Sequence, residues 1–204
     1  MTKTTKTTKT TAKPTADLQS IMLAAIKVRI DNAPNVNQAE NLETEYKFFA
    51  DVNGAAILDK VSSIVDVPAL ARKIAICDKS APDFVAVYAL QKVRKMVYAL
   101  ANGARSFVDG YSNSIISNMV QLQELTNKSA LVALSKSIEY SELDKVQAIK
   151  RTINVAVSTA STQASSTRQM LRLLDVASVT KRKTGDEFTF NDTASARAII
   201  AFYA

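Results

Sequence analysis

The sequence predicts a mainly α-helical protein, in which a helical bundle is followed by a C-terminal segment with one β-hairpin. Three observations lead to this prediction. Apolar residues recur at spacings of three and four from residue 18 to residue 138, which is the period of an amphipathic helix. Strand-like alternation begins only after residue 175. Hydrophobic residues make up 47% of the 204 residues, which is enough to bury a core.

The first segment, residues 1–15, repeats a Thr-Lys-Thr unit. Residues 2–11 contain no apolar side chain, so burial cannot offset the entropy that ordering this backbone would cost. We therefore expect a disordered basic tail, whose lysines would contact phosphate groups without reading sequence. Its four lysines are Lys3, Lys6, Lys9 and Lys13.

Residues 16–138 are predicted to form a helical bundle, because cap and turn residues separate a series of apolar stripes. The first helix should end before Pro34, and Asn37 is the expected cap of the second. Asn53-Gly54 should separate the second helix from the third. The expected helices run over residues 15–31, 37–49, 57–65, 68–74, 80–101, 112–125 and 129–138. The fifth carries three basic residues that we interpret as a solvent-exposed face: Lys92, Arg94 and Lys95.

Residues 139–204 show a different order of elements and are predicted to form a separate C-terminal module. The residues Thr184-Gly185-Asp186 supply the turn that a β-hairpin requires. The expected elements are, in order, a helix at 141–149, a polar stretch at 158–165, a helix at 166–175, a strand at 176–179, a returning strand that carries Phe188 and Phe190, and a helix at 193–203.

The order of helix, polar turn, helix and basic hairpin over residues 141–192 resembles a winged helix-turn-helix domain. The resemblance implies that residues 166–175 form a recognition helix, whose N-terminal residues lie in the major groove. Arg and Gln are both competent to read base edges there. It also implies a wing from Val179 to Phe190. The residues that would contact nucleic acid are Ser165, Ser166, Thr167, Arg168, Gln169, Arg172, Lys181, Arg182 and Lys183.

A second interpretation of the same residues is structural. The polar stretch 158–165 contains no glycine for a compact turn, and it would serve equally as a linker. The hairpin would then be a small sheet that covers one end of the helical bundle, with its basic turn exposed to solvent. The two interpretations predict the same secondary structure and differ only in what the basic residues contact.

The net charge of +7 is concentrated at the two ends of the chain. Residues 1–15 hold four basic and no acidic side chains, and residues 150–204 hold eight basic and four acidic ones. Residues 16–149 are close to neutral, with 14 basic and 15 acidic side chains. Such asymmetry favours an anionic partner, above all nucleic acid, with DNA expected before RNA. Charged ends that only aid solubility are the alternative.

The composition argues against catalysis and against a bound metal or cofactor. The sequence has no histidine, which is the commonest general base and metal ligand, and its single cysteine is Cys77. The four glycines stand far apart, so no glycine-rich phosphate loop is present. Aspartates recur near the expected helix ends, where they are more often caps than catalytic groups: Asp51, Asp59, Asp66, Asp78 and Asp83.

The sequence also favours a soluble chain in a reducing, cytoplasmic compartment. No apolar run approaches the ~18–20 residues that a bilayer span needs, and the basic start has no apolar segment behind it. A lone cysteine fits a reducing environment. We expect a non-catalytic DNA-binding protein, regulatory or of phage or mobile-element type. The alternative is a structural or assembly protein, such as a virion component, whose helices form an oligomer and whose tail contacts nucleic acid or a neighbouring subunit.

Overall fold

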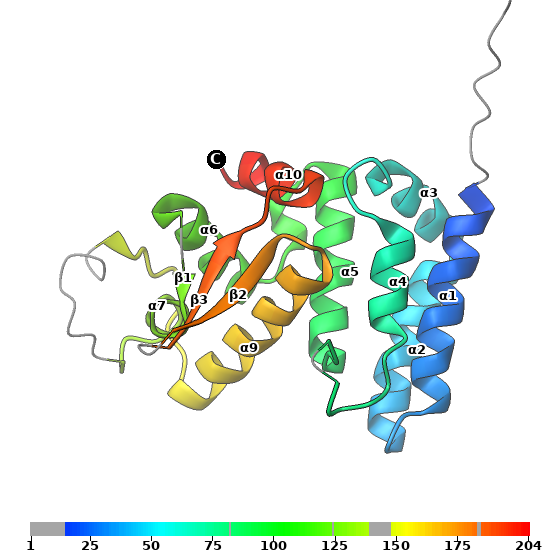
Figure 1. Ribbon diagram of the computed structural model, residues 1–204, viewed down its shortest axis with the longest axis horizontal. Helices are drawn as coiled ribbons and strands as arrows, with labels where there is room; N and C mark the ends of the chain where they lie inside the picture. The colour runs from blue at the N-terminus through cyan, green and yellow to red at the C-terminus, as the bar shows by residue number, and fades with distance from the viewer. Residues whose placement is uncertain (1–14, 82, 124, 139–147, 183–184) are drawn as a thin grey trace, which may run out of the picture.

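The computed structural model describes residues 15–81, 83–123, 125–138, 148–182 and 185–204. The predicted fold class is confirmed, because the described chain is mainly helical and carries one β-hairpin (Figure 1). Its elements are α1 (Thr15–Asp31), α2 (Val36–Ala50), α3 (Val52–Val61), α4 (Val67–Ile74), α5 (Val87–Asn102), the 3-10 helix η1 (Arg105–Phe107), α6 (Gly110–Leu122), β1 (Leu125–Thr126), α7 (Asn127–Val132), α9 (Val157–Leu173), β2 (Ala177–Arg182), β3 (Gly185–Phe190) and α10 (Ala194–Tyr203).

Helix α5 separates the two sides of the molecule. Helices α1 to α4 lie on one side of it, with α1 packed against α2, α3 and α4. Helix α9 and the sheet lie on the other side, where α9 packs against α5, α6 and α7 (Figure 1). One core joins both sides, from Met22 on α1 to Ile199 on α10. The helical body and the C-terminal module, which were predicted to be separate and to meet at residue 138, therefore share this core.

Side-chain caps fix most helix starts among the described residues, and three helix starts differ from the predicted ones. The cap of α2 is Asn35, whose side chain accepts a hydrogen bond from the backbone N–H of Gln38, so the prediction of Asn37 was wrong. Asn53 and Gly54 lie in the first turn of α3, because Asp51 caps this helix directly after α2. Helix α5 begins only at Val87, whereas a start at residue 80 was predicted.

The fifth helix also departs from prediction in its charges. Lys92 is buried, with its ammonium group bonded to Asp109, and Arg94 is paired with the buried Glu45. Both residues were predicted, with Lys95, to form a solvent-exposed face, so the prediction for Lys92 was wrong. Its burial depends on Asp109, which follows η1 and lies 17 residues away in the sequence, so helix periodicity alone could not reveal it.

The sheet has three antiparallel strands in the order β1-β3-β2. The predicted hairpin is present, and the register pairs Ala177 with Phe190 at one end and Arg182 with Gly185 at the other. Strand β1 was not predicted, because two residues are too short for an alternation pattern; it pairs Leu125 with Phe188. The sheet thereby ties the segment before α7 to the C-terminal hairpin.

The connection from α9 into β2 reverses the chain direction. Leu174 ends the helix, and Asp175 takes a left-handed conformation with a φ of 56°. The N–H of Val176 then donates to the carbonyl of Leu171 at 2.8 Å, which closes the helix end with a Schellman-type bond. Asn191 donates to the carbonyl and carboxylate of Asp175 and fixes the turn from the other strand. The hairpin consequently returns alongside α9.

Among the described residues, no helix is both long enough and apolar enough to cross a membrane. The helix predicted over residues 141–149 falls mainly on residues 139–147, which lie outside the described part of the chain.

Candidate nucleic-acid interface

Helix α9 is one continuous helix from Val157 to Leu173, and this corrects the predicted turn. The polar stretch 158–165 was expected to be a turn or a linker, and it forms the first half of the helix instead. Its hydroxyl groups bond within the helix: Thr162 donates to the carbonyl of Ser158 at 3.2 Å, and Thr167 donates to that of Gln163 at 2.8 Å. The small side chains of Ala160 and Ala164 are buried and let the helix pack closely.

Two of the predicted contact residues face the core. Ser166 and Thr167 are both buried, and the Thr167 hydroxyl lies 3.1 Å from that of Ser112 on α6. The prediction placed them at the exposed N-terminus of a recognition helix. That placement was wrong, because the helix begins nine residues earlier, at Val157. In this conformation neither side chain is accessible to a ligand.

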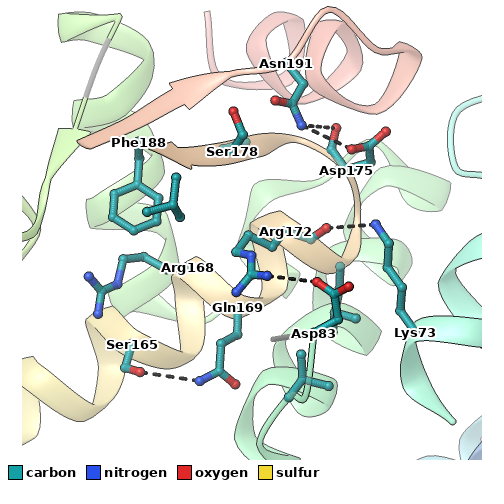
Figure 2. A pocket seen from close by; sticks show the side chains of 14 residues that line it. Lys73, Asp83, Ser165, Arg168, Gln169, Arg172, Asp175, Ser178, Phe188 and Asn191 are labelled. Carbon is teal, nitrogen blue, oxygen red and sulfur yellow. Dashed lines mark hydrogen bonds and ion pairs between the residues drawn. The ribbon is translucent and has the colours of Figure 1, made fainter. Parts of the chain in front are cut away.

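Gln169 and Arg172 hold α9 against the loop that precedes α5. The amide oxygen of Gln169 accepts a 2.7 Å hydrogen bond from the N–H of Ala86. Arg172 forms a 2.9 Å ion pair with Asp83, and its backbone carbonyl accepts a hydrogen bond from Lys73 (Figure 2). Both side chains were predicted to contact nucleic acid. The contacts seen here give them a role in joining the two sides of the molecule.

Arg168 lies over the ring of Phe188, with its guanidinium carbon 5.1 Å from the ring centroid (Figure 2). This cation–π contact joins the exposed side of α9 to strand β3. The two elements border an open cavity of about 690 Å³, which Ser165, Ser178 and Asn191 also line. Four of the predicted contact residues of α9 line this cavity: Ser165, Arg168, Gln169 and Arg172.

The remaining predicted residues lie near the hairpin turn or outside the described part of the chain. Lys181 and Arg182 are the last two residues of β2, paired with Asp186 and Gly185, so they adjoin the hairpin turn. Lys183 and the tail lysines Lys3, Lys6, Lys9 and Lys13 lie outside the described residues.

The first turn of α9 is open to an anion. Its cap position is Ala156, which makes no side-chain cap hydrogen bond, and the first turn contains no acidic residue. The N–H groups at the start of a helix have no partner within the helix, and the helix dipole favours negative charge there. Ser158, Ser161 and Thr162 are exposed along the same end. The start of α9 thus presents backbone amides and hydroxyl groups together.

Basic residues precede this helix start in the chain. The segment before α9 carries Lys150 and Arg151, both exposed. Asn118 on α6 fixes the backbone of Lys150 with two hydrogen bonds of 2.8 and 2.9 Å. Nε of Arg151 donates to the carbonyl of Val132 at 2.8 Å, which places it at the end of α7.

Lys136 lies still closer to the helix start. Its backbone N–H donates at 2.9 Å to the side chain of Asn154, two residues before the cap position Ala156. The N–H of Val155 donates to the carbonyl of Leu134 in the same region. These bonds hold the loop after α7 beside the beginning of α9, with the exposed Lys136 upon it.

Sequence reasoning missed Lys136, Lys150, Arg151 and the N-terminal face of α9. One signal was present: residues 148–174 contain four basic and no acidic side chains. Within it, residues 158–165 were predicted to be a turn or a linker because they are small and polar and include no large apolar side chain. Only the buried alanines and the neighbouring helices show that it is a helix with one exposed face.

Among the described residues, no three acidic or cysteine side chains come together in a way that could hold a metal ion. The start of α9 presents backbone amides and hydroxyl groups, which supply hydrogen bonds, and the loop bonded beside it carries Lys136, which supplies positive charge. Comparisons of this chain with protein-family models, with curated proteins and with solved structures found no match.

Proposed function

We propose that this chain is a nucleic-acid-binding protein, with duplex DNA as its expected ligand, and that the N-terminal half of α9 is the contact helix. The observation that carries the proposal is the uncapped, acid-free first turn of α9 with Lys136 fixed beside it. Helix N-termini bind phosphate groups through their free amides and dipole. A neighbouring lysine adds the charge that phosphate binding requires.

The side chains on the exposed end of α9 favour contacts to the nucleic-acid backbone. Ser158, Ser161 and Thr162 carry short hydroxyl groups, which allow a phosphate to approach closely and can donate to it. Side chains that pair with base edges by two hydrogen bonds, such as Arg or Asn, are missing from these three positions. The proposal is therefore binding that depends weakly on sequence.

The hairpin supports a winged helix arrangement in this part of the chain. Strand β2 packs on α9 and runs back along it, so that the C-terminal end of β2 lies toward the N-terminal end of the helix (Figure 1). Strand β1, placed between α6 and α7, completes the sheet through β3, as in a winged helix. In the proposed arrangement α9 as a whole replaces the predicted recognition helix 166–175, and Lys181 and Arg182 belong to the wing.

Charge reversal at the helix start tests the proposal. Fluorescence anisotropy with a labelled random duplex should give a lower affinity for Lys136→Glu and Lys150→Glu than for the parent chain. Each variant removes a cation and adds an anion near phosphate, so we expect a loss of about tenfold or more, with a flatter salt dependence. Lys47→Glu on α2 is the matched control, since Lys47 is an exposed lysine on the other side of α5.

A second set of variants tests the exposed face of α9 and the wing. Ser161→Asp places a carboxylate on the exposed end of α9 and should weaken duplex binding, whereas Ser161→Ala should change it little. A triple substitution of Lys181, Arg182 and Lys183 by alanine should also weaken it. Unchanged duplex affinity in Lys136→Glu, Ser161→Asp and the triple variant would refute the proposal. A stable oligomer without duplex affinity would support the assembly function instead.

A further inference from the structure

A second surface of the molecule combines aromatic rings with lysines. It lies between the end of α2, helix α3 and the C-terminal half of α5, and η1 borders it. The cavity there has a volume of about 610 Å³. In Figure 1, α3 lies at the opposite end of the molecule from the start of α9, so this surface is separate from the proposed duplex interface.

Three aromatic rings from three different elements line this cavity. Phe48 and Tyr98 have their ring centroids 5.9 Å apart, and Tyr98 and Phe107 have theirs 4.7 Å apart, each pair edge to face. Phe107 remains 44% exposed. A ring that is held at one side by another ring and open at the other offers a face on which a flat ligand can stack.

The charge of the cavity is positive. Its lining contains Lys60, Arg94 and Lys95, and Asp51 is the one acidic residue among the described residues that line it. Arg94 is already matched by Glu45, with a 2.7 Å ion pair, and its guanidinium lies 5.1 Å from the centroid of Phe48. Neither Lys60 nor Lys95 has an ion pair with any residue that the structure describes.

The acidic residue that lines the cavity, Asp51, caps helix α3. One carboxylate oxygen of Asp51 accepts hydrogen bonds from the backbone and side-chain nitrogens of Asn53, at 2.8 and 2.7 Å, and so caps α3. Its charge faces the start of that helix. The two lysines are therefore the cations that remain for a ligand.

We propose that this cavity binds single-stranded nucleic acid, with a base stacked on Phe107 beside Tyr98 and the adjoining phosphates held by Lys60 and Lys95. Stacking platforms combined with lysines are the means by which proteins hold single strands without reading sequence. A duplex does not fit this chemistry, since its bases already stack on one another. The inference goes beyond the proposed duplex interface and does not depend on it.

The test uses the full-length chain and a labelled oligothymidylate of about ten nucleotides, followed by fluorescence anisotropy. An oligomer of equal length without bases is the comparison ligand. We expect the parent chain to bind oligothymidylate more tightly than the abasic strand. Phe107→Ala should lower the affinity for oligothymidylate by about 5- to 100-fold, which is the range measured for loss of one base–aromatic stack.

Matched variants separate stacking from folding. Phe107→Leu keeps an apolar side chain but removes the ring, so it should lose affinity as Phe107→Ala does while it keeps the parent's thermal unfolding midpoint. Tyr88→Ala is the control, because Tyr88 is 59% exposed at the other end of α5. The joint substitution of Lys60 and Lys95 by glutamine should reduce the salt slope for the single strand by about 1.4, at about 0.7 for each phosphate contact.

Two results would overturn the inference. One is equal affinity of the parent chain for oligothymidylate and the abasic strand. The other is unchanged affinity in Phe107→Leu and Phe107→Ala, which would leave the cavity to another class of ligand, such as an acidic peptide. Duplex binding is measured in parallel: a chain that fails on duplex DNA but loses single-strand affinity with Phe107→Leu refutes the proposed function and supports this inference.

Discussion

The ammonium group of Lys92 donates a 2.8 Å hydrogen bond to Oδ1 of Asp109, and the pair lies inside the molecule with side chains only 7% and 13% exposed. Lys92 also donates to the hydroxyl of Ser112 at 3.0 Å, and that hydroxyl lies 3.1 Å from the hydroxyl of Thr167. This polar network joins α5, α6 and α9 through the core.

The network sets the charge states of its two ions. Burial lowers the pKa of Lys92, and the neighbouring Asp109 carboxylate opposes that shift. For Asp109, burial acts to raise the pKa, but Lys92 and the hydrogen bonds from Ser112 together outweigh it and lower the pKa. Each group thus favours the charged form of the other, while burial disfavours the charged form of both.

Substitution of Lys92 by methionine should therefore cost about 3–5 kcal/mol of unfolding free energy, because it leaves the buried Asp109 carboxylate without a cation. Urea unfolding followed by circular dichroism measures the loss. The double variant Lys92→Met/Asp109→Asn should be less destabilised than the sum of the two single variants. Additive losses would mean that the pair is not coupled. Lys95→Met is the control and should change stability by less than about 0.5 kcal/mol.

Glu45 should make stability depend on pH. Burial raises the pKa of Glu45 above its ordinary value of 4.5, against the opposing effect of Arg94. Oε1 of this carboxyl has no hydrogen-bond partner among the described residues, which fits a costly ionised form. Above about pH 4.5 the folded chain thus retains a proton that the unfolded chain has lost. The contribution of Glu45 to the unfolding free energy is therefore full below that pH and declines as the pH rises through the folded-state pKa.

Glu45→Gln removes this titration. We expect the parent chain to be more stable relative to Glu45→Gln at about pH 4 than at about pH 7. Urea unfolding at both pH values measures this difference in unfolding free energy. Glu43→Gln on the same helix is the control, because Glu43 is exposed. A difference between parent and Glu45→Gln that is constant with pH would show that folding leaves the pKa of Glu45 unchanged, and a difference that grows in the parent's favour as pH rises would show that Arg94 lowers this pKa.

Gly54→Ala should destabilise the chain although alanine is the better helix former. A Cβ atom at this position would lie 2.6 Å from the carbonyl oxygen of Phe48 and 2.7 Å from that of Phe49, and both are backbone atoms. Helix propensity favours alanine by about 1 kcal/mol. The crowding should exceed this gain and give a net loss of about 1–3 kcal/mol. Thermal unfolding decides the sign: a rise in the midpoint would show that α2 and α3 can move apart.

The tail lysines should contribute to the salt dependence of nucleic-acid binding. Deletion of residues 2–13 removes four lysines and should reduce the slope of log affinity against log salt by about 3–4 for duplex DNA, at about 0.9 for each phosphate contact. A chain with all four lysines changed to glutamine should show the same reduction, and one with four arginines should keep the parent's slope. An unchanged slope after deletion would remove the tail from the interaction.

Much of the fold was accessible from sequence, because helix periodicity and hairpin turns are local properties. The apolar stripes of α1, α4 and α6, and the turn chemistry near Gly185, each act within a few residues. The predictions failed where a distant partner decides the outcome. Lys92 lies in the core because Asp109 is there, and residues 158–165 are helical because Ala160 and Ala164 pack against other helices.

In the candidate interface, too, local properties were predictable and the effects of distant residues were not. Composition alone located the positive charge at residues 1–15 and 150–204, since charge is read directly from residue types. The winged helix resemblance placed Ser166 and Thr167 among the contact residues, and the folded chain buries both. The sequence by itself determined a mainly helical chain with one hairpin and positive charge at both ends. Only tertiary structure decided which residues of α9 remain exposed and which basic residues lie near its start, because burial depends on helices that are distant in sequence.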